Sequence, residues 1–118
     1  MAAKDAVGAY GERVAVRHLQ SAGMVVLHRN WRCRDGEIDV IARDGDTLVF
    51  CEVKTRRSVA YGTPAAAVVP AKLQRLHRLA LCWLEEAGLH SPELRFDVVA
   101  VRPRPQGRAD VEHLRGVL

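Results

Sequence analysis

Residues 36–57 read GEIDVIARDGDTLVFCEVKTRR and decide the fold of this chain. In their first half, apolar residues alternate with acidic ones around Ile38, Val40 and Ala42. The pair Asp44-Gly45 then interrupts the pattern, and an apolar run continues from Leu48 to Thr55. Because glycine tolerates the positive φ that tight hairpin turns need, we predict a β-hairpin that turns at Asp44-Gly45.

The segment before the hairpin predicts a helix and a strand. Between Ala6 and Ala22, apolar and small residues recur at the spacing of one helix face, and Gly23 is placed to end that helix. Met24 to Leu27 is typical of a short strand. The basic stretch that follows, which we expect to be a loop, contains Arg29, Arg32 and Arg34.

The segment after the hairpin predicts a second helix and two more strands. Thr63-Pro64 and Pro70 are typical of helix starts, and an apolar stripe from Leu73 to Ala87 ends at Gly88. The apolar run Leu94 to Val101 indicates a buried strand, and Asp110 to Leu114 a shorter edge strand, with an exposed turn over residues 102–108. The predicted order is αβββαβ with a final β, an α/β domain with a central mixed sheet flanked by two long helices.

Composition limits the kinds of protein this chain can be. Its 118 residues, 48% of them hydrophobic, fit one domain over residues 1–118. The net charge of +4 permits a polyanionic partner, while 5% aromatic residues are too few for several base-stacking platforms. No apolar stretch approaches the roughly 18 residues that span a bilayer, and the first residues lack the apolar core of a signal peptide. We therefore expect a cytoplasmic protein without membrane contact.

The cysteines and histidines do not indicate a metal centre. The three cysteines, Cys33, Cys51 and Cys82, form no CxxC pair, and two of them sit inside apolar runs where a thiol behaves as a small hydrophobe. The five histidines show no metal-ligand spacing with them. A structural zinc site is not expected.

Acidic and basic residues on the hairpin indicate a candidate site. With Asp44-Gly45 as a two-residue loop, Asp39 faces Phe50 and Glu37 faces Glu52. Asp39, Glu52 and Lys54 then share one face of the sheet, with Asp39 diagonal to Glu52 at a distance that a cation can bridge. A one-residue slip of the register would break up this cluster.

Such a cluster has a chemical use. Mg²⁺ prefers oxygen ligands and is usually held by one or two carboxylates, here Asp39 and Glu52, with water and phosphate oxygens. Lys54 is placed to stabilise charge on the phosphorane or to orient and deprotonate the attacking water. Glu12, on the first helix, is placed to lean over the sheet and complete the outer shell of the metal. The alternative for Glu52 and Lys54 is a solvated strand face with a weak ion pair.

Basic residues near the predicted site suggest a wall that binds phosphate. Lys72, Arg75 and Arg78 recur at three-residue spacing on the second helix. Arg56 and Arg57 follow the strand that carries Lys54. The alternative for the helical residues is an ordinary solvated helix face.

The two halves of the hairpin, residues 36–45 and 48–56, resemble the YraN family of small bacterial proteins. The resemblance extends over nearly the whole chain and includes Gly11-Glu12, Arg29-Asn30-Trp31-Arg32, Tyr61-Gly62, Lys72 with Leu76, and the run from Arg95 to Val101. That family is similar to the PD-(D/E)xK nuclease superfamily and is closest to archaeal Holliday junction resolvases. The resemblance implies a restriction-endonuclease-like fold, metal ligation by Asp39 and Glu52, a catalytic role for Lys54 and an auxiliary acidic role for Glu12.

These observations predict an endonuclease that uses Mg²⁺ or Mn²⁺ to hydrolyse DNA, with branched or junction DNA as one substrate class in repair or recombination. Arg56, Arg57, Lys72 and Arg75 are the predicted DNA-binding residues. The alternative is a non-catalytic nucleic-acid-binding protein with the same fold, and a third class is a protein-interaction module. Paired cuts in a symmetric junction would need two copies of this one-site chain, so a homodimer is expected for that substrate.

Overall fold

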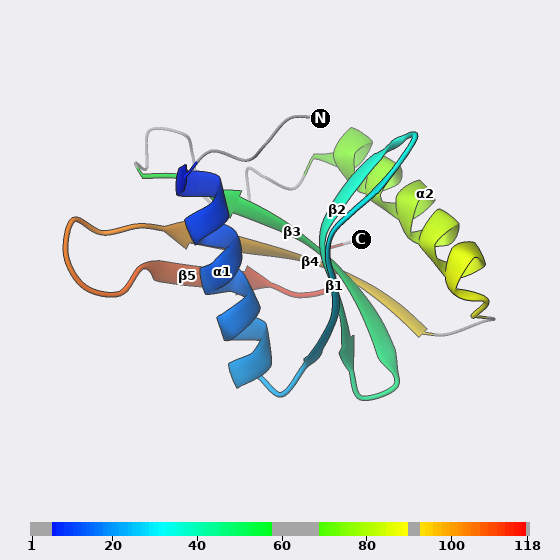
Figure 1. Cartoon of the computed structure of the whole chain (residues 1–118), viewed down its shortest axis with the longest axis horizontal. Coiled ribbons are helices and arrows are strands. Elements are labelled where there is room, and N and C mark those ends of the chain that lie inside the picture. Colours follow the sequence, from blue (N-terminus) through cyan, green and yellow to red (C-terminus); the bar gives the residue numbers. More distant parts are fainter. Residues whose placement is uncertain (1–5, 58–68, 90–92, 118) are drawn as a thin grey trace.

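The predicted order of helices and strands is confirmed by the computed structural model, which describes residues 6–57, 69–89 and 93–117. The elements are α1 (Ala6–Ser21), β1 (Val25–Cys33), β2 (Gly36–Asp44), β3 (Thr47–Thr55), α2 (Pro70–Ala87), β4 (Glu93–Arg102) and β5 (Asp110–Leu114) (Figure 1). The expected helix start at Thr63-Pro64 and the Tyr61-Gly62 pair lie outside the described residues.

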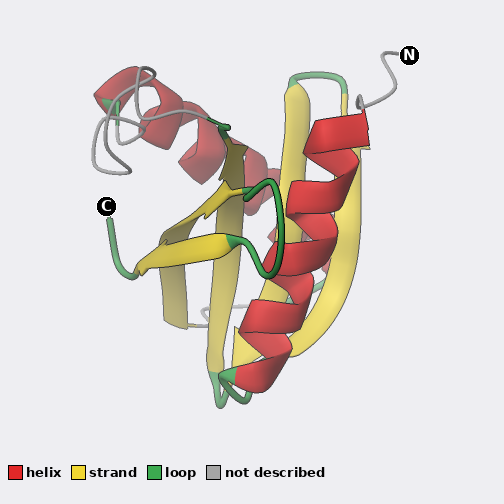
Figure 2. Cartoon of the chain, turned by 90° about the vertical axis from the view of Figure 1, so that its left-hand side faces the viewer, coloured by secondary structure: helices red, strands yellow, loops and turns green. Residues whose placement is uncertain are grey.

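One mixed sheet forms the centre of the domain. Its strands lie in the order β1-β2-β3-β4-β5, and every neighbouring pair is antiparallel except β3 and β4. The parallel pair needs a crossover, and α2 lies in the connection that makes it. Figures 1 and 2 show the two helices well apart, with strands between them. The α/β class and the mixed sheet flanked by two helices are as predicted.

The two faces of the sheet build two separate apolar cores. Because side chains alternate along a strand, Val49 and Cys51 of β3 pack with the α1 residue Leu19. Phe50, which lies between them in the strand, points to the other face and packs with Leu79 of α2. Phe50 also stacks on Phe96 of β4 with ring centroids 5.7 Å apart. α1 and α2 therefore cover opposite faces of β3.

Two glycines occupy positions where a side chain would not fit or the backbone is left-handed, one in α1 and one directly after α2. At Gly11, a Cβ would lie 1.8 Å from Thr55 Oγ1, so the absence of a side chain lets α1 lie directly against β3. At the other helix, Gly88 follows α2 with φ 69°, the left-handed conformation that ends helices. Pro70 begins α2 in its first turn, as the sequence predicts.

β1 is longer than predicted. The strand runs on through Arg29 and Arg32 to Cys33, so the expected basic loop over these residues is wrong. Pairing with β2 along almost its whole length extends β1, and Trp31, opposite Ile38, is buried. Trp31 Nε1 donates to Glu86 Oε2 of α2 at 2.8 Å, which holds this hairpin against the helix.

The turn between β2 and β3 lies one residue later than predicted. Asp44 pairs with Thr47, so the two loop residues are Gly45 and Asp46 rather than Asp44 and Gly45. Gly45 has φ 61° at the first loop position, where type II′ turns carry glycine. Ile41, not Asp39, therefore faces Phe50. The loop still has two residues, so the paired side chains keep their predicted faces. Ile38, beyond the last pair, does not, because it packs in the α2-side core rather than with Val40.

Candidate functional site

A pocket of about 330 Å³ opens where β2 and β3 stop pairing. The last backbone pair is Val40 with Cys51. At the next residue, a side-chain hydrogen bond takes the place of the backbone pairing. Asp39 Oδ2 accepts the backbone N–H of Val53 at 2.8 Å. α2 lines the pocket on one side, and α1 reaches it with Gly8. The pocket thus forms at a junction of both helices with the central strands.

The three predicted catalytic residues of the hairpin all line this pocket. Asp39 and Glu52 are the residues that adjoin the last backbone pair, Val40 with Cys51. Lys54 Nζ lies 3.3 Å from Glu52 Oε1, and both side chains are about a quarter exposed. Two carboxylates and an ammonium group therefore share one partly desolvated pocket.

Glu37 also lines the pocket, but not opposite Glu52 as predicted. Its partner in the sheet is Arg32 of β1. Arg32 Nε lies 3.0 Å from Glu37 Oε2, which is an ion pair by distance although the atoms lack hydrogen-bond geometry. Glu37 does not face Glu52 because the turn lies one residue later than predicted, and Arg32 neutralises the Glu37 carboxylate.

Basic side chains from α2 complete the pocket wall. Lys72 and Arg75 line it together with Lys54. The positive charge of Lys54 lowers the pKa of Lys72, and the Glu52 carboxylate opposes that effect. Like charges held this close favour an anion between them. Two of the four predicted DNA-binding residues thus belong to the pocket.

The other basic residues lie at or beyond its rim. Arg56 is exposed, donates from Nη1 to Thr55 O at 2.9 Å, and is close enough to Lys72 to contribute to its lowered pKa. Arg57 follows it and is exposed. Arg78 is exposed on α2, and among the described residues it is not part of the pocket lining.

Glu12 takes a different position from the one expected. Its side chain is buried, 2% exposed, and Oε1 accepts from Asn30 Nδ2 at 2.7 Å and from Arg29 Nη2 at 3.3 Å. Asn30 lies between the β1 residues paired with Val40 and Ile38, so it is level with Asp39. Glu12 therefore approaches the level of Asp39 from the α1 side, but it is not among the described residues that line the pocket.

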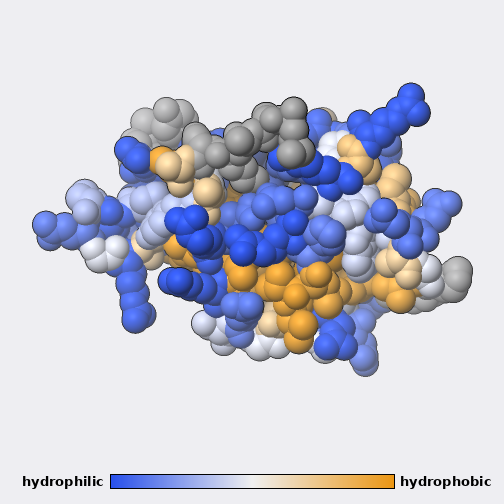
Figure 3. Space-filling model, viewed as in Figure 1, coloured by the Kyte–Doolittle hydropathy of each residue, from blue (hydrophilic) through white to orange (hydrophobic). Residues whose placement is uncertain are grey.

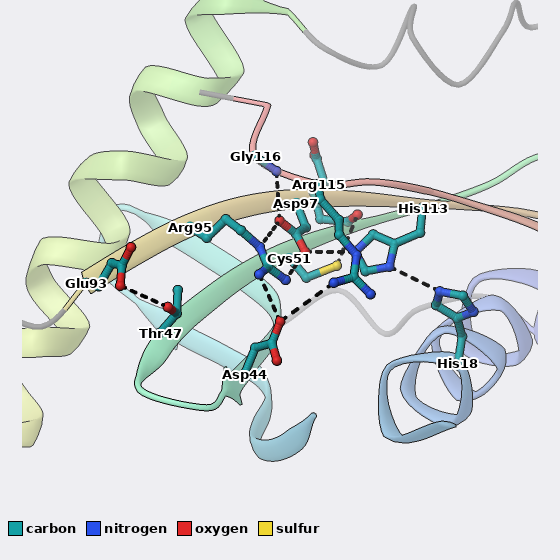
Figure 4. A network of polar contacts seen from close by, with 11 residues as sticks. His18, Asp44, Thr47, Cys51, Glu93, Arg95, Asp97, His113, Arg115 and Gly116 are labelled. Atoms are coloured by element: carbon teal, nitrogen blue, oxygen red, sulfur yellow. Dashed lines mark hydrogen bonds and ion pairs between the residues drawn. The ribbon is translucent and has the colours of Figure 1, made fainter. Parts of the chain in front are cut away.

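Sequence reasoning missed a second polar centre, which Figure 4 shows. Asp97, fully buried on β4, pairs with Arg95 through both oxygens at 3.0 Å and accepts the N–H of Gly116 at 3.1 Å. His113 Nε2 lies 2.7 Å from Asp97 Oδ2, and its Nδ1 lies 3.1 Å from His18 Nε2. The signal in the sequence was one acid inside the apolar run 94–101.

This second centre ties β4 to β5 and α1. Burial raises the pKa of Asp97, but Arg95, the Gly116 N–H and His113 together outweigh it and leave the pKa lowered. Burial lowers the pKa of His18, and the positive charge of His113 lowers it further. Burial also raises the pKa of the Cys51 thiol. The charges are satisfied within the network, which is typical of a structural centre.

The pocket residues fit a hard divalent cation. Asp39 and Glu52 offer oxygen ligands on adjacent strands, the donor type that Mg²⁺ and Mn²⁺ prefer. In the described part of the chain, no three His, Cys, Asp or Glu side chains converge as metal ligands. A cation here would therefore take two carboxylates from the protein and its other ligands from water and substrate, which is the usual Mg²⁺ arrangement.

Fold and pocket together define a small α/β domain with a five-stranded mixed sheet and a polar pocket of mixed charge. The sequence profile of "Uncharacterised protein family UPF0102" matches residues 11–101. The chain belongs to this family, the group that the YraN resemblance indicated. None of the described helices is long and apolar enough to cross a membrane.

Relatives from this family match 98% or more of the chain. A UPF0102 protein of Kineococcus radiotolerans is 64% identical over 116 residues, covering 98% of this chain and 95% of its own. One from Beutenbergia cavernae is 62% identical over 117 residues, with 99% of both chains covered. One from Streptomyces griseus is 55% identical over 118 residues, with 99% of both chains covered.

Proposed function

We propose that the pocket is the active site of a metal-dependent endonuclease that hydrolyses DNA phosphodiester bonds in the cytoplasm. The observation that carries this proposal is the convergence of Asp39, Glu52 and Lys54 from two neighbouring strands into one pocket. The αβββαβ order and the parallel β3–β4 pair agree with the restriction-endonuclease-like fold of the PD-(D/E)xK superfamily. Branched or junction DNA is the substrate class that the family resemblance suggests.

The three hairpin residues and Glu12 each have a role in this mechanism. Asp39 and Glu52 would hold Mg²⁺ or Mn²⁺, and the bound ion would supply Lewis-acid activation of the scissile phosphate. The bond to the Val53 N–H fixes the orientation of the Asp39 carboxylate. Lys54, held at Glu52, donates to the attacking water or to the phosphoryl oxygens on which negative charge grows. Glu12 is the auxiliary acid, and its bond to Asn30 fixes the strand residue level with Asp39.

The basic wall binds the DNA backbone. Lys72 and Arg75 stand beside Lys54 at the pocket, and Arg56 and Arg57 extend the positive surface along the end of β3. Contacts of this kind grip phosphates without reading sequence. DNA affinity should therefore fall steeply with salt, and neutralising Lys72 should weaken binding uniformly across sequences and reduce the salt slope by about one unit.

The test is cleavage of linear, flapped and four-way DNA with Mg²⁺, Mn²⁺ or chelator. The key variant is Asp39→Asn, because the amide oxygen still accepts the Val53 N–H while the ligand charge is lost. The matched control is Asp46→Asn, the same change at an exposed turn position. We expect metal-dependent cleavage by the control and a loss on the order of a hundredfold in Asp39→Asn, the upper end of the losses that changes at metal sites typically give. Absence of any product that depends on both metal and Asp39 would end the nuclease proposal.

A non-catalytic nucleic-acid-binding protein is the second candidate. The observation that favours it is the basic wall, which would bind a phosphate backbone without any metal. In that case Lys72→Ala and Arg75→Ala weaken salt-dependent DNA binding, while Asp39→Asn changes neither binding nor any product. A protein that shows no salt-dependent DNA affinity would contradict both candidates.

A further inference from the structure

The outward face of α2 carries apolar side chains that no part of the described chain covers. Leu76, Ala80 and Leu84 pack in the core, so the opposite side of the helix, which carries Leu81 and Cys82, faces outward. Leu81 is 49% exposed at the middle of the helix, and Cys82 beside it is exposed as well. The prediction that a cysteine in an apolar run behaves as a buried hydrophobe therefore holds for Cys51 but not for Cys82.

Opposite charges flank this apolar centre at equal distances. Arg78 precedes Leu81 by three residues and Glu85 follows Cys82 by three, and both charged side chains are exposed. Two turns, about 10 Å along the axis, separate Arg78 from Glu85, which is too far for a pair within one helix. In the described part of the chain neither forms an ion pair.

We propose that a second copy of this chain docks here, with the two α2 helices packed antiparallel about a twofold axis between Leu81 and Cys82. In that arrangement Arg78 of each copy meets Glu85 of the other, and Leu81 of each copy lies at the centre against Cys82 of the other. The pattern is self-complementary, as a twofold interface requires. It is independent of the proposed nuclease activity, because Arg78, Leu81, Cys82 and Glu85 lie outside the pocket.

The exposed apolar residues of β1 are less suited to a second copy. β1 is an edge strand with Val25 48% and Leu27 43% exposed, and Figure 3 shows apolar surface on the face of the molecule that carries α1 and β1. However, a bulge interrupts the β1 register at Leu27, and Arg29 and Arg32 add charge to the edge. Bulges and charges are the features that prevent edge strands from pairing with another chain.

The contact should be weak. α2 has 18 residues and so a length of about 27 Å, and one helix pair of this size is at the small end of specific interfaces. We expect a dissociation constant on the order of tens of micromolar. Sedimentation equilibrium between about 5 and 500 µM covers that range.

A charge-swap series tests the interface. Arg78→Glu places like charges together at both symmetry-related contacts and should weaken the dimer about 30-fold, as should Glu85→Arg. The double variant Arg78→Glu with Glu85→Arg restores opposite charges and should restore the dimer. Circular dichroism and thermal melting check that each variant folds like the wild type, as expected for exposed positions.

Chemical cross-linking gives an independent readout. In a Cys33→Ser background, a short bismaleimide should join Cys82 of the two copies, and Cys82→Ser should abolish the product. A protein that stays monomeric at 500 µM would overturn the proposal. A dimer that Arg78→Glu leaves intact, or one that the double variant fails to restore, would overturn it equally. A dimer abolished by Leu27→Lys but not by Arg78→Glu would place the contact on β1 instead.

Discussion

Asp97→Asn should strongly destabilise the protein, although Asp97 lies outside the proposed active site. The carboxylate is fully buried and both oxygens bind Arg95, while Oδ2 also contacts His113. An amide at this position would remove the negative charge, and its NH₂ group would face the N–H groups of Arg95 or His113. Breaking a buried ion pair costs about 3–5 kcal/mol, and the lower end, about 3 kcal/mol, applies here because Arg95 is partly exposed and keeps Asp44.

The pH dependence of this loss has a defined sign. The pKa of Asp97 is lowered in the folded protein, so its contribution to the free energy of unfolding is present above the unfolded pKa of about 3.9. That contribution is lost as the pH falls through the lowered folded value. The difference in stability between wild type and Asp97→Asn should therefore be constant near pH 7 and shrink below about pH 4.

Urea and thermal unfolding followed by circular dichroism measure both effects. At pH 7 we expect the melting temperature of Asp97→Asn to fall by about 12 °C, at about 4 °C per kcal/mol for a chain of this size. The control is Asp110→Asn, whose carboxylate pairs with Arg102 and Arg104 on the surface and whose loss should leave the melting temperature nearly unchanged. Equal melting temperatures for the two variants, or an undiminished difference at pH 3, would refute the reasoning.

Three further predictions concern α1, β1 and the pocket. Gly11→Ala should lower the unfolding free energy by about 2 kcal/mol in urea titrations, because the new methyl group overlaps Thr55, and Thr55→Ala should recover part of the loss. Asn30 has φ 53°, so Asn30→Ala should be about 1 kcal/mol less stable than Asn30→Gly, and equal stability would contradict this. Lys54→Met should raise the pKa of Lys72 toward its ordinary value in an NMR titration, since the Lys54 charge is the main cause of its depression; an unchanged pKa would show that the two groups do not interact.

Most of the fold follows from local sequence patterns. The helix periods, Gly23, Pro70 and Gly88 predict the two helices because these signals act within a few residues. The length of β1 could not be predicted this way, since its second half is polar and is held in the sheet by pairing with β2. The turn was misplaced by one residue because Asp44-Gly45 and Gly45-Asp46 are both acceptable turn pairs.

The candidate site was predictable in part. An even loop predicts Asp39, Glu52 and Lys54 on one face, whichever residue begins the turn, and all three line the same pocket. The partner of Glu37, by contrast, depends on the true register and on the extension of β1 to Arg32. The network around Asp97 joins residues from α1, β4 and β5, and no spacing in the sequence relates His18 to His113.

The sequence by itself determined the order of the elements and the faces of the paired hairpin side chains, because helix and strand periods are properties of the local backbone. Only the tertiary structure decided which helix and which side chains pack against each face. The crossover places α2 over the face of Glu52 and so brings Lys72 and Arg75 to the pocket. It also turns Leu81 outward and leaves it exposed. These outcomes depend on packing between segments distant in the chain, where the geometry of the whole sheet, rather than any local preference, sets which side chains meet.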